Sequence, residues 1–300
     1  MDEGSSSVIV KENKTEICGW TTQTYDLDHY DSGDGNDPKY PHTVLMFVPG
    51  NPGCVGWYIG MLKTIVERLG IGYSCRAVNY AGHSTEPRLV RAKDDAAEKV
   101  AWTVDGQVQH KIEWVDKVTA DLVERRPKSA NLPRFIFVSH SIGGQLVQRS
   151  CLLRKDILFR TDAILHLMPF IRFDTKNNLL SAFAHSPDWT IPMMQMVSKF
   201  AAKIPDGFAH GILEHNTGIS LSDDRRIVMD LFQNHEYIKN HLELGLEEIR
   251  EIPECHDVSL FTLQRNCFTR FFCLNYVSFN PDSSCVFDLL HHVRWQRWKF

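Results

Sequence analysis

The stretch Ser139-His140-Ser141-Ile142-Gly143 could carry nucleophilic chemistry. It lies between an apolar run and an amphipathic run, and the small residues two positions on either side of Ser141 allow a sharp turn. Such a turn exposes the Ser141 hydroxyl and points the N–H of Ile142 at a developing oxyanion, with the helix N-terminus adding partial positive charge. Such a turn would suit attack on an ester carbonyl. The alternative is a hydroxyl that only caps the helix, and the turn alone does not decide between them.

A second loop could complete an oxyanion hole. The loop 49–53, with the sequence PGNPG, directly follows the apolar run 43–48. Its glycines let the backbone approach a ligand, and Pro52 has no N–H to donate. We therefore expect the backbone N–H of Asn51 to be the second oxyanion donor, beside that of Ile142. Taken alone, the loop would be interpreted as a tight turn. The loop and the serine turn together favour an esterase-type site.

The elements that must position these residues alternate between two hydrophobic periods. Short apolar runs, typical of buried strands, are followed by longer segments whose apolar residues recur every three or four positions, as in amphipathic helices. This alternation predicts an α/β fold, a mostly parallel sheet with helices on both faces. The predicted strands are residues 43–48, the segment from 73 to a Gly-His-Ser turn at 82–84, 134–140 and 163–170, and the predicted helices contain Leu62 to Leu69, Val104 to Leu122 and residues 142–155.

Composition excludes several classes of protein. The 300 residues are 43% hydrophobic and 23% charged, as in a globular protein, and the net charge of −4 offers no basic surface to nucleic acid. The acidic N-terminus lacks the features of a secretory signal peptide, so we expect an intracellular protein. No apolar run reaches the ~20 residues of a membrane-spanning helix. The eight cysteines show no CxxC pair and no zinc-ligand spacing, so neither a metal nor a cofactor is expected.

A dinucleotide or phosphate site is an alternative, because Gly50, Gly53 and Gly56 recur after a strand. Pro49 and Pro52, however, occupy positions where a phosphate cradle needs N–H donors. No acidic residue ends the next strand, where residues 78–80 are Val-Asn-Tyr. We therefore reject this class of site.

Four segments, in order, resemble the lipid droplet-associated hydrolase family: FVPGNPGCVGWYIGMLKTI, NYAGHS, DGQVQHKIEWV and VSHSIGGQL. The resemblance covers about residues 40–250, and Ser139 replaces the first glycine of the G-x-S-x-G turn. It implies an α/β-hydrolase fold, Ser141 as nucleophile, and a peripheral position on lipid droplets or the endoplasmic reticulum surface. It also implies a carboxylic ester substrate, such as a sterol or acylglycerol ester, and a role in lipid storage or turnover.

The expected organisation is an N-terminal segment, 1–40, and a hydrolase domain, 41–300, with a helical cap insert at about 172–235. The insert is rich in Met, Phe and Trp. Apolar walls there would suit a lipid acyl chain, and the insert could also lie flat on a lipid surface. A plain packed pair of helices is the alternative, and exposed apolar area would distinguish the two.

The tail, from about residue 263 to 300, departs from the family pattern of a Gly-x-x-Asp loop and a later Pro-His pair. One interpretation makes LNYVSF a replacement strand, with Asp282 as the acid and His291 or His292 as the base. We favour a non-native tail and an incomplete triad, because ~10 residues barely allow a helix crossover between acid and base. The chain would then be a weak or inactive member that binds lipid droplets. His83, His140, His256 and Asp257 are weaker candidates.

Overall fold

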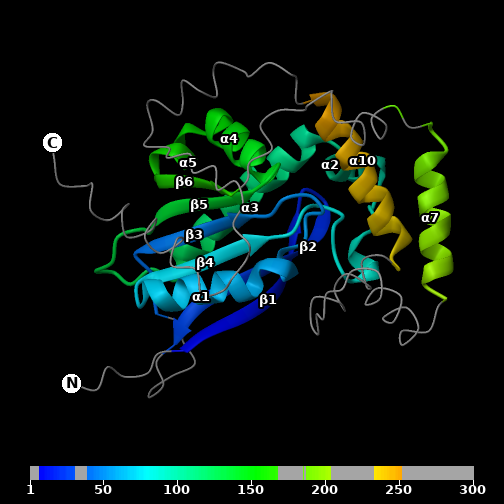
Figure 1. Ribbon diagram of the computed structural model, residues 1–300. Coiled ribbons are helices and arrows are strands. Elements are labelled where there is room, and N and C mark those ends of the chain that lie inside the picture. The colour runs from blue at the N-terminus through cyan, green and yellow to red at the C-terminus, as the bar shows by residue number, and fades with distance from the viewer. Residues whose placement is uncertain (1–6, 31–38, 168–184, 186, 204–232, 252–300) are drawn as a thin grey trace.

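The computed structural model describes residues 7–30, 39–167, 185, 187–203 and 233–251, which build one mixed sheet with helices packed around it (Figure 1). The described strands lie in the order β1-β2-β4-β3-β5-β6. β4, β3, β5 and β6 pair in parallel, whereas β1 and β2 pair antiparallel with each other and β2 pairs antiparallel with β4. The strands are β1 (Ser7–Ile17), β2 (Trp20–Tyr30), β3 (Thr43–Val48), β4 (Tyr73–Val78), β5 (Arg134–His140) and β6 (Thr161–Leu167).

The predicted helices between these strands are also present. The helices described up to β6 are α1 (Ile59–Leu69), α2 (Asp95–Trp102), α3 (Val104–Glu124), α4 (Gly143–Leu153) and α5 (Lys155–Phe159). The predictions of strands at 43–48 and 134–140, of the strand that begins at residue 73, and of the helices around Leu62 to Leu69 and Val104 to Leu122 are confirmed. α2 and α5 were not predicted.

The hydrophobic core consists of two layers, one on each face of the sheet. Side chains alternate along β3, because successive residues of a strand point to opposite faces. Val44 and Met46 join the layer formed with α3 and α4, whereas Leu45 and Phe47 join the layer formed with α1. All four side chains are at most 1% exposed. Burial on both faces explains why the parallel strands appear in the sequence as unbroken apolar runs.

Residues 7–30 form a hairpin, β1 and β2, that extends this sheet. The sequence analysis assigned no strands to this segment. β1 is an edge strand among the described elements, and its charged side chains Lys11, Glu12, Lys14 and Glu16 are exposed. The inner strand β2 is buried along most of its length.

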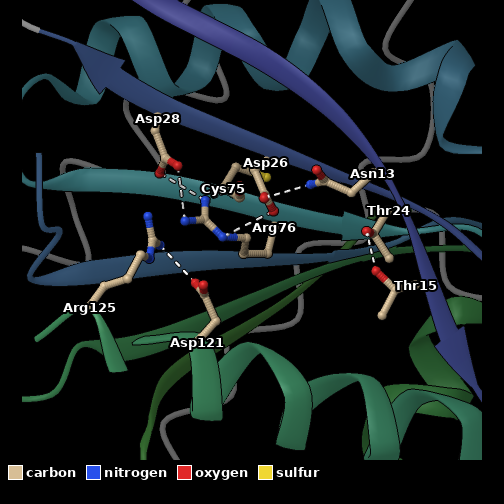
Figure 2. Close-up of polar contacts among 9 residues, drawn as sticks. All are labelled: Asn13, Thr15, Thr24, Asp26, Asp28, Cys75, Arg76, Asp121 and Arg125. Carbon is tan, nitrogen blue, oxygen red and sulfur yellow. Dashed lines mark hydrogen bonds and ion pairs between the residues drawn. The ribbon is translucent and has the colours of Figure 1, made fainter. Parts of the chain in front are cut away.

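β2 and β4 share a buried charged cluster (Figure 2). The Arg76 guanidinium, 2% exposed, donates to both carboxylate oxygens of Asp28, at 2.8 and 3.1 Å, and lies 3.2 Å from Asp26. Asp26 also accepts a hydrogen bond of 2.7 Å from Asn13 of β1. The cluster thus joins β1, β2 and β4, and the charges of Arg76, Asp26 and Asp28 all have partners within it.

Two later helices lie at the end of the sheet where β3 and β5 terminate (Figure 1). α10 (His235–Glu251) contacts α2 and α3, and α7 (Thr190–Ala201) packs against the outer side of α10. The rest of the predicted insert, like the predicted residues 168–170 of β6, lies outside the described residues. Among the described helices, none combines the length and the hydropathy needed to cross a membrane.

Candidate active site

The strand order itself predicts where a ligand binds. The chain leaves β3 toward β4 on one side and returns to β5 on the other side of β3. In an open α/β sheet, the loops that follow two such strands diverge and leave a crevice at their carboxyl ends. The loop after β3 is PGNPG, and the turn after β5 contains Ser141. Both predicted oxyanion elements therefore lie at this position.

Ser141 occupies a strained turn between β5 and α4. Its φ is 50°, in the left-handed region that non-glycine residues seldom adopt, and its N–H donates to the Leu167 carbonyl at 3.0 Å. α4 begins without a side-chain cap, so the Ser141 hydroxyl does not serve as the helix cap that the sequence left as an alternative. Backbone strain of this kind persists where the surrounding structure enforces it, and it is concentrated at functional sites.

Close packing explains the small residues around Ser141. A Cβ on Gly143 would lie 2.4 Å from the Pro49 carbonyl oxygen, so α4 can approach the end of β3 only with glycine there. Ser139, which replaces the first glycine of the usual turn, is fully buried, and its hydroxyl lies 2.6 Å from Nδ1 of His166 on β6. The departure from glycine is thus accommodated by a hydrogen bond within the sheet.

The PGNPG loop lies directly against the turn that contains Ser141. A Cβ on Gly50 would lie 2.8 Å from the Ser141 Cβ, so the loop can pack this closely only with glycine at position 50. In the part of the chain that the structure describes, no acceptor takes the N–H of Asn51 or of Ile142. Two unpaired donors beside a serine are what an oxyanion hole requires.

Two tyrosine hydroxyls hold the PGNPG loop and the neighbouring His140. The Tyr80 hydroxyl, in a side chain only 1% exposed, donates to the Pro49 carbonyl at 2.6 Å. The Tyr58 hydroxyl lies 2.9 Å from Nδ1 of His140, and burial raises the pKa of Tyr58 to about 12. His140 is thereby held by Tyr58, as expected for a side chain that points away from the nucleophile.

The family-specific GQ-x-x-HK segment supports the loop after β4. The Gln107 side chain accepts from the Ala81 N–H and donates to the Ala81 carbonyl, both at 3.2 Å. Lys111 is 1% exposed, and its Nζ contacts the Asn79 carbonyl, the Gln107 side chain and Nδ1 of His110. Burial holds the pKa of Lys111 well below its usual range. These residues serve to fix the loop that contacts the PGNPG segment.

α10 supplies residues that the sequence analysis missed. Nδ1 of His241 lies 2.5 Å from Oδ1 of Asn51, and the Asn51 side-chain amide donates to the His241 carbonyl at 3.4 Å. The Tyr237 hydroxyl donates to the Pro52 carbonyl at 2.9 Å. Glu248 is 8% exposed, and burial raises its pKa to about 8 although a hydrogen bond from Asn51 lowers it. Their i, i+4 and i+11 spacing from Tyr237 places all three on one helix face.

The predicted acid and base lie outside the part of the chain that the structure describes. Asp282, His291, His292, His256 and Asp257 lie outside the described residues. Within the described ranges, no histidine forms a hydrogen bond with the Ser141 hydroxyl.

His83, another of the weaker candidates, lies in the loop after β4. It is fully buried beside Tyr80 and Tyr237, and its Nδ1 lies 2.8 Å from the Ala81 carbonyl. Burial lowers the pKa of His83 to about 3, which keeps the ring neutral.

Among the described residues there is no group of three His, Cys, Asp or Glu side chains that could hold a metal ion.

Two of the known proteins that this chain matches carry the same name. The lipid droplet-associated hydrolase of Gallus gallus is 25% identical over 60% of this chain and 50% of its own length. The Homo sapiens protein of the same name is 28% identical over 44% and 37%, respectively. The matched region thus spans half or less of these relatives. A solved epoxide hydrolase of Vigna radiata is similar over 95% of this chain and 96% of its own, with 14% identity and a TM-score of 0.48.

The family model described as "Lipid-droplet associated hydrolase" matches residues 41–277. This match includes the PGNPG loop, the serine turn and the buried GQ-x-x-HK segment. Together with the mostly parallel sheet and the strained serine turn, it identifies the fold as that of an α/β hydrolase. The chain therefore belongs to the lipid droplet-associated hydrolase family.

Proposed function

We propose that this chain is a serine hydrolase that cleaves carboxylic ester bonds of lipids, with Ser141 as the nucleophile. The observation that carries the proposal is the left-handed Ser141 at the end of β5, with Gly50 of the PGNPG loop packed closely against it. Sterol and acylglycerol esters are the substrate class that the family relationship favours, in lipid storage or turnover.

The reaction would begin with attack of the Ser141 hydroxyl on the ester carbonyl. The carbonyl oxygen becomes an oxyanion, which the N–H groups of Asn51 and Ile142 would stabilise together with the N-terminus of α4. The intermediate collapses, the alcohol leaves with a proton, and water releases the acyl group from the serine. A histidine would accept the serine proton, and Asp282 with His291 or His292 stays our prediction for the acid and base.

Activity-based labelling tests the nucleophile. The purified chain is incubated with a fluorophosphonate probe, and labelling at Ser141 is expected in wild type and absent in Ser141→Ala. A full-length relative serves as the positive control. If the relative is labelled and this chain is not, the chain has no active nucleophile, and the proposal fails.

We further propose that the outer face of α7 contacts the surface of a lipid droplet. Trp189, Met193, Met196 and Phe200 recur with helical spacing and are 60%, 39%, 53% and 61% exposed. They lie opposite the buried side chains that pack toward α10, and Lys199 and Lys203 flank them. An apolar stripe bordered by lysines suits a monolayer with anionic phospholipid. The endoplasmic reticulum surface would offer the same chemistry.

Flotation with triolein droplets coated with phosphatidylcholine and phosphatidylserine tests this surface. Replacing Met196 and Phe200 with serine should abolish co-flotation, because the buried apolar area is lost. Leu153→Ser is the matched control, since Leu153 is 62% exposed at the end of α4. Equal loss in the control, or undiminished binding in the α7 variant, contradicts the proposed surface.

A second candidate function, binding at droplets without hydrolysis, is favoured by one observation. No described histidine is hydrogen-bonded to Ser141. Expression of wild type and Ser141→Ala in the same cells, followed by measurement of droplet size, separates the two functions. Equal effects favour binding, whereas an effect confined to wild type favours hydrolysis.

A further inference from the structure

The side chain of Asn51 is held by α10. Its Oδ1 lies 2.5 Å from Nδ1 of His241, and its Nδ2 donates to the His241 carbonyl at 3.4 Å. Its side chain also acts on Glu248, whose pKa burial raises and Asn51 lowers. These contacts join two segments 190 positions apart in the sequence. The residue proposed to donate to the oxyanion is therefore fixed by a helix outside the sheet.

The chemistry of the amide fixes the protonation of His241. An amide oxygen can only accept a hydrogen bond, so Nδ1 of His241 must carry the proton and Nε2 the lone pair. Burial lowers the pKa of His241 to about 4, which keeps the ring neutral near pH 7. His241 thus donates to Asn51 without introducing a charge beside the oxyanion hole.

Glu248, two helical turns after His241, also faces this loop as a neutral group below about pH 8. Its Oε1 is buried and has no partner within the described part of the chain. Burial raises the pKa of Tyr80, from the loop after β4, and Glu248 is close enough to raise it further. His241 contacts the same Asn51 side chain. On the solvent side, Arg149 of α4 pairs with Asp105 of α3 and with Glu251.

α10 is itself firmly anchored. The Asn240 side chain donates to the carbonyls of Gly82 and Val90, at 2.8 and 3.1 Å, and accepts from the Trp102 indole at 2.8 Å. Asn51 also precedes a proline, which restricts its backbone. With its side chain held by α10, little freedom remains for rotation of its N–H.

We infer that His241 and Glu248 are positioning residues, which hold Asn51 so that its N–H points at the oxyanion. The inference rests on the proposed function and assigns the alignment of its oxyanion hole to α10. A misaligned donor weakens the transition state more than the substrate complex, so loss of the contact should lower kcat and leave KM almost unchanged.

Kinetics of p-nitrophenyl butyrate hydrolysis by the full chain tests this. His241→Ala should lower kcat ~10–100-fold, somewhat less than complete removal of an oxyanion donor, with KM within ~2-fold. His241→Asn keeps a donor near the Nδ1 position and should recover most of kcat. Glu248→Leu should lower kcat in the same way, whereas Glu248→Gln should not. His235→Ala is the control, because the side chain of His235 lies on the same helix and pairs with its neighbour Glu236.

Amide hydrogen exchange of residues 50–53 gives a readout that does not require activity. His241→Ala should increase exchange in this loop, and His241→Asn should not. Unchanged kcat and unchanged exchange in His241→Ala overturn the inference, and so does an equal loss of kcat in His241→Asn. If Ser141→Ala hydrolyses the ester as fast as wild type, the proposed function fails, and the exchange data still decide whether α10 holds the loop.

Discussion

The buried polar cluster around Arg76 and the one around Asn51 solve different physical problems. In the first, charged groups of β2 and β4 are paired with one another (Figure 2). In the second, the buried titratable groups His241 and Glu248 are neutral near pH 7, and one Glu248 oxygen has no partner among the described residues.

The difference indicates a structural role for the Arg76 cluster and a role in the proposed chemistry for the Asn51 cluster. A buried charge is tolerated only when it is paired, so the Arg76 cluster fixes how β2 lies against β4. Neutral titratable groups with unused hydrogen-bonding capacity, next to a strained serine, are typical of sites that handle a reacting molecule. Substitutions at five positions test this comparison.

The largest effect is expected at Ser141. Ser141→Ala should lower ester hydrolysis by about 10⁴-fold or more, because the nucleophile is lost. Ser141→Gly should be equally inactive but more stable by ~1 kcal/mol, since glycine adopts a φ of 50° without steric cost. Chemical denaturation of both variants checks the second point. Equal stability of the Gly and Ala variants would show that the turn stores no strain.

The next largest effect is expected at Arg76. Arg76→Met leaves Asp28 and Asp26 buried without their partner, so the free energy of unfolding should fall by ~3–5 kcal/mol. The cluster lies away from the serine turn, so kcat per folded molecule should not change. Urea denaturation and active-site titration measure the two quantities. A large fall in kcat at unchanged stability would contradict the assignment of this cluster to structure.

Glu248→Gln should stabilise the protein in a pH-dependent way. The folded-state pKa of about 8 lies above the unfolded value near 4.3, so the favourable contribution of the protonated form is lost as the pH rises through this window. The variant stays neutral throughout and should be more stable than wild type by on the order of 2–4 kcal/mol at pH 8, but by about 1 kcal/mol or less at pH 5. Thermal unfolding at both pH values measures this, with Glu243→Gln as the control. If Glu248→Gln gained the same stability at both pH values, the Glu248 carboxyl would not be protonated near neutral pH in the folded protein.

The smallest effects are expected at two glycines. Gly143→Ala places a Cβ 2.4 Å from the Pro49 carbonyl and should destabilise the protein by ~1–3 kcal/mol. Gly60→Ala, in α1, meets no atom within 4 Å and should stabilise it by up to ~1 kcal/mol. Melting temperatures distinguish the two. Tolerance of alanine at 143 would mean that α4 can move away from β3.

The parallel strands were predictable because burial on both faces leaves unbroken apolar runs, as at 43–48 and 134–140. The hairpin β1–β2 was missed because its strands carry many polar residues, including Thr24, Asp26 and Asp28, whose partners come from other elements. The contact of Asn51 with His241 could not be predicted from local patterns, since it depends on how α10 packs across the end of the sheet. The predicted roles of Ser141, Asn51 and Ile142 stay predictions that labelling and kinetics can decide.

The exposed charges of β1 have a consequence for solubility. An edge strand presents unpaired backbone groups that can recruit a strand from another molecule. Lys11, Glu12, Lys14 and Glu16 make such pairing unfavourable, because a second copy would have to bury or oppose these charges. On the lipid surface proposed above, copies of the protein would meet at high local concentration. Among the described strands, the charged edge of β1 disfavours pairing with a second copy there.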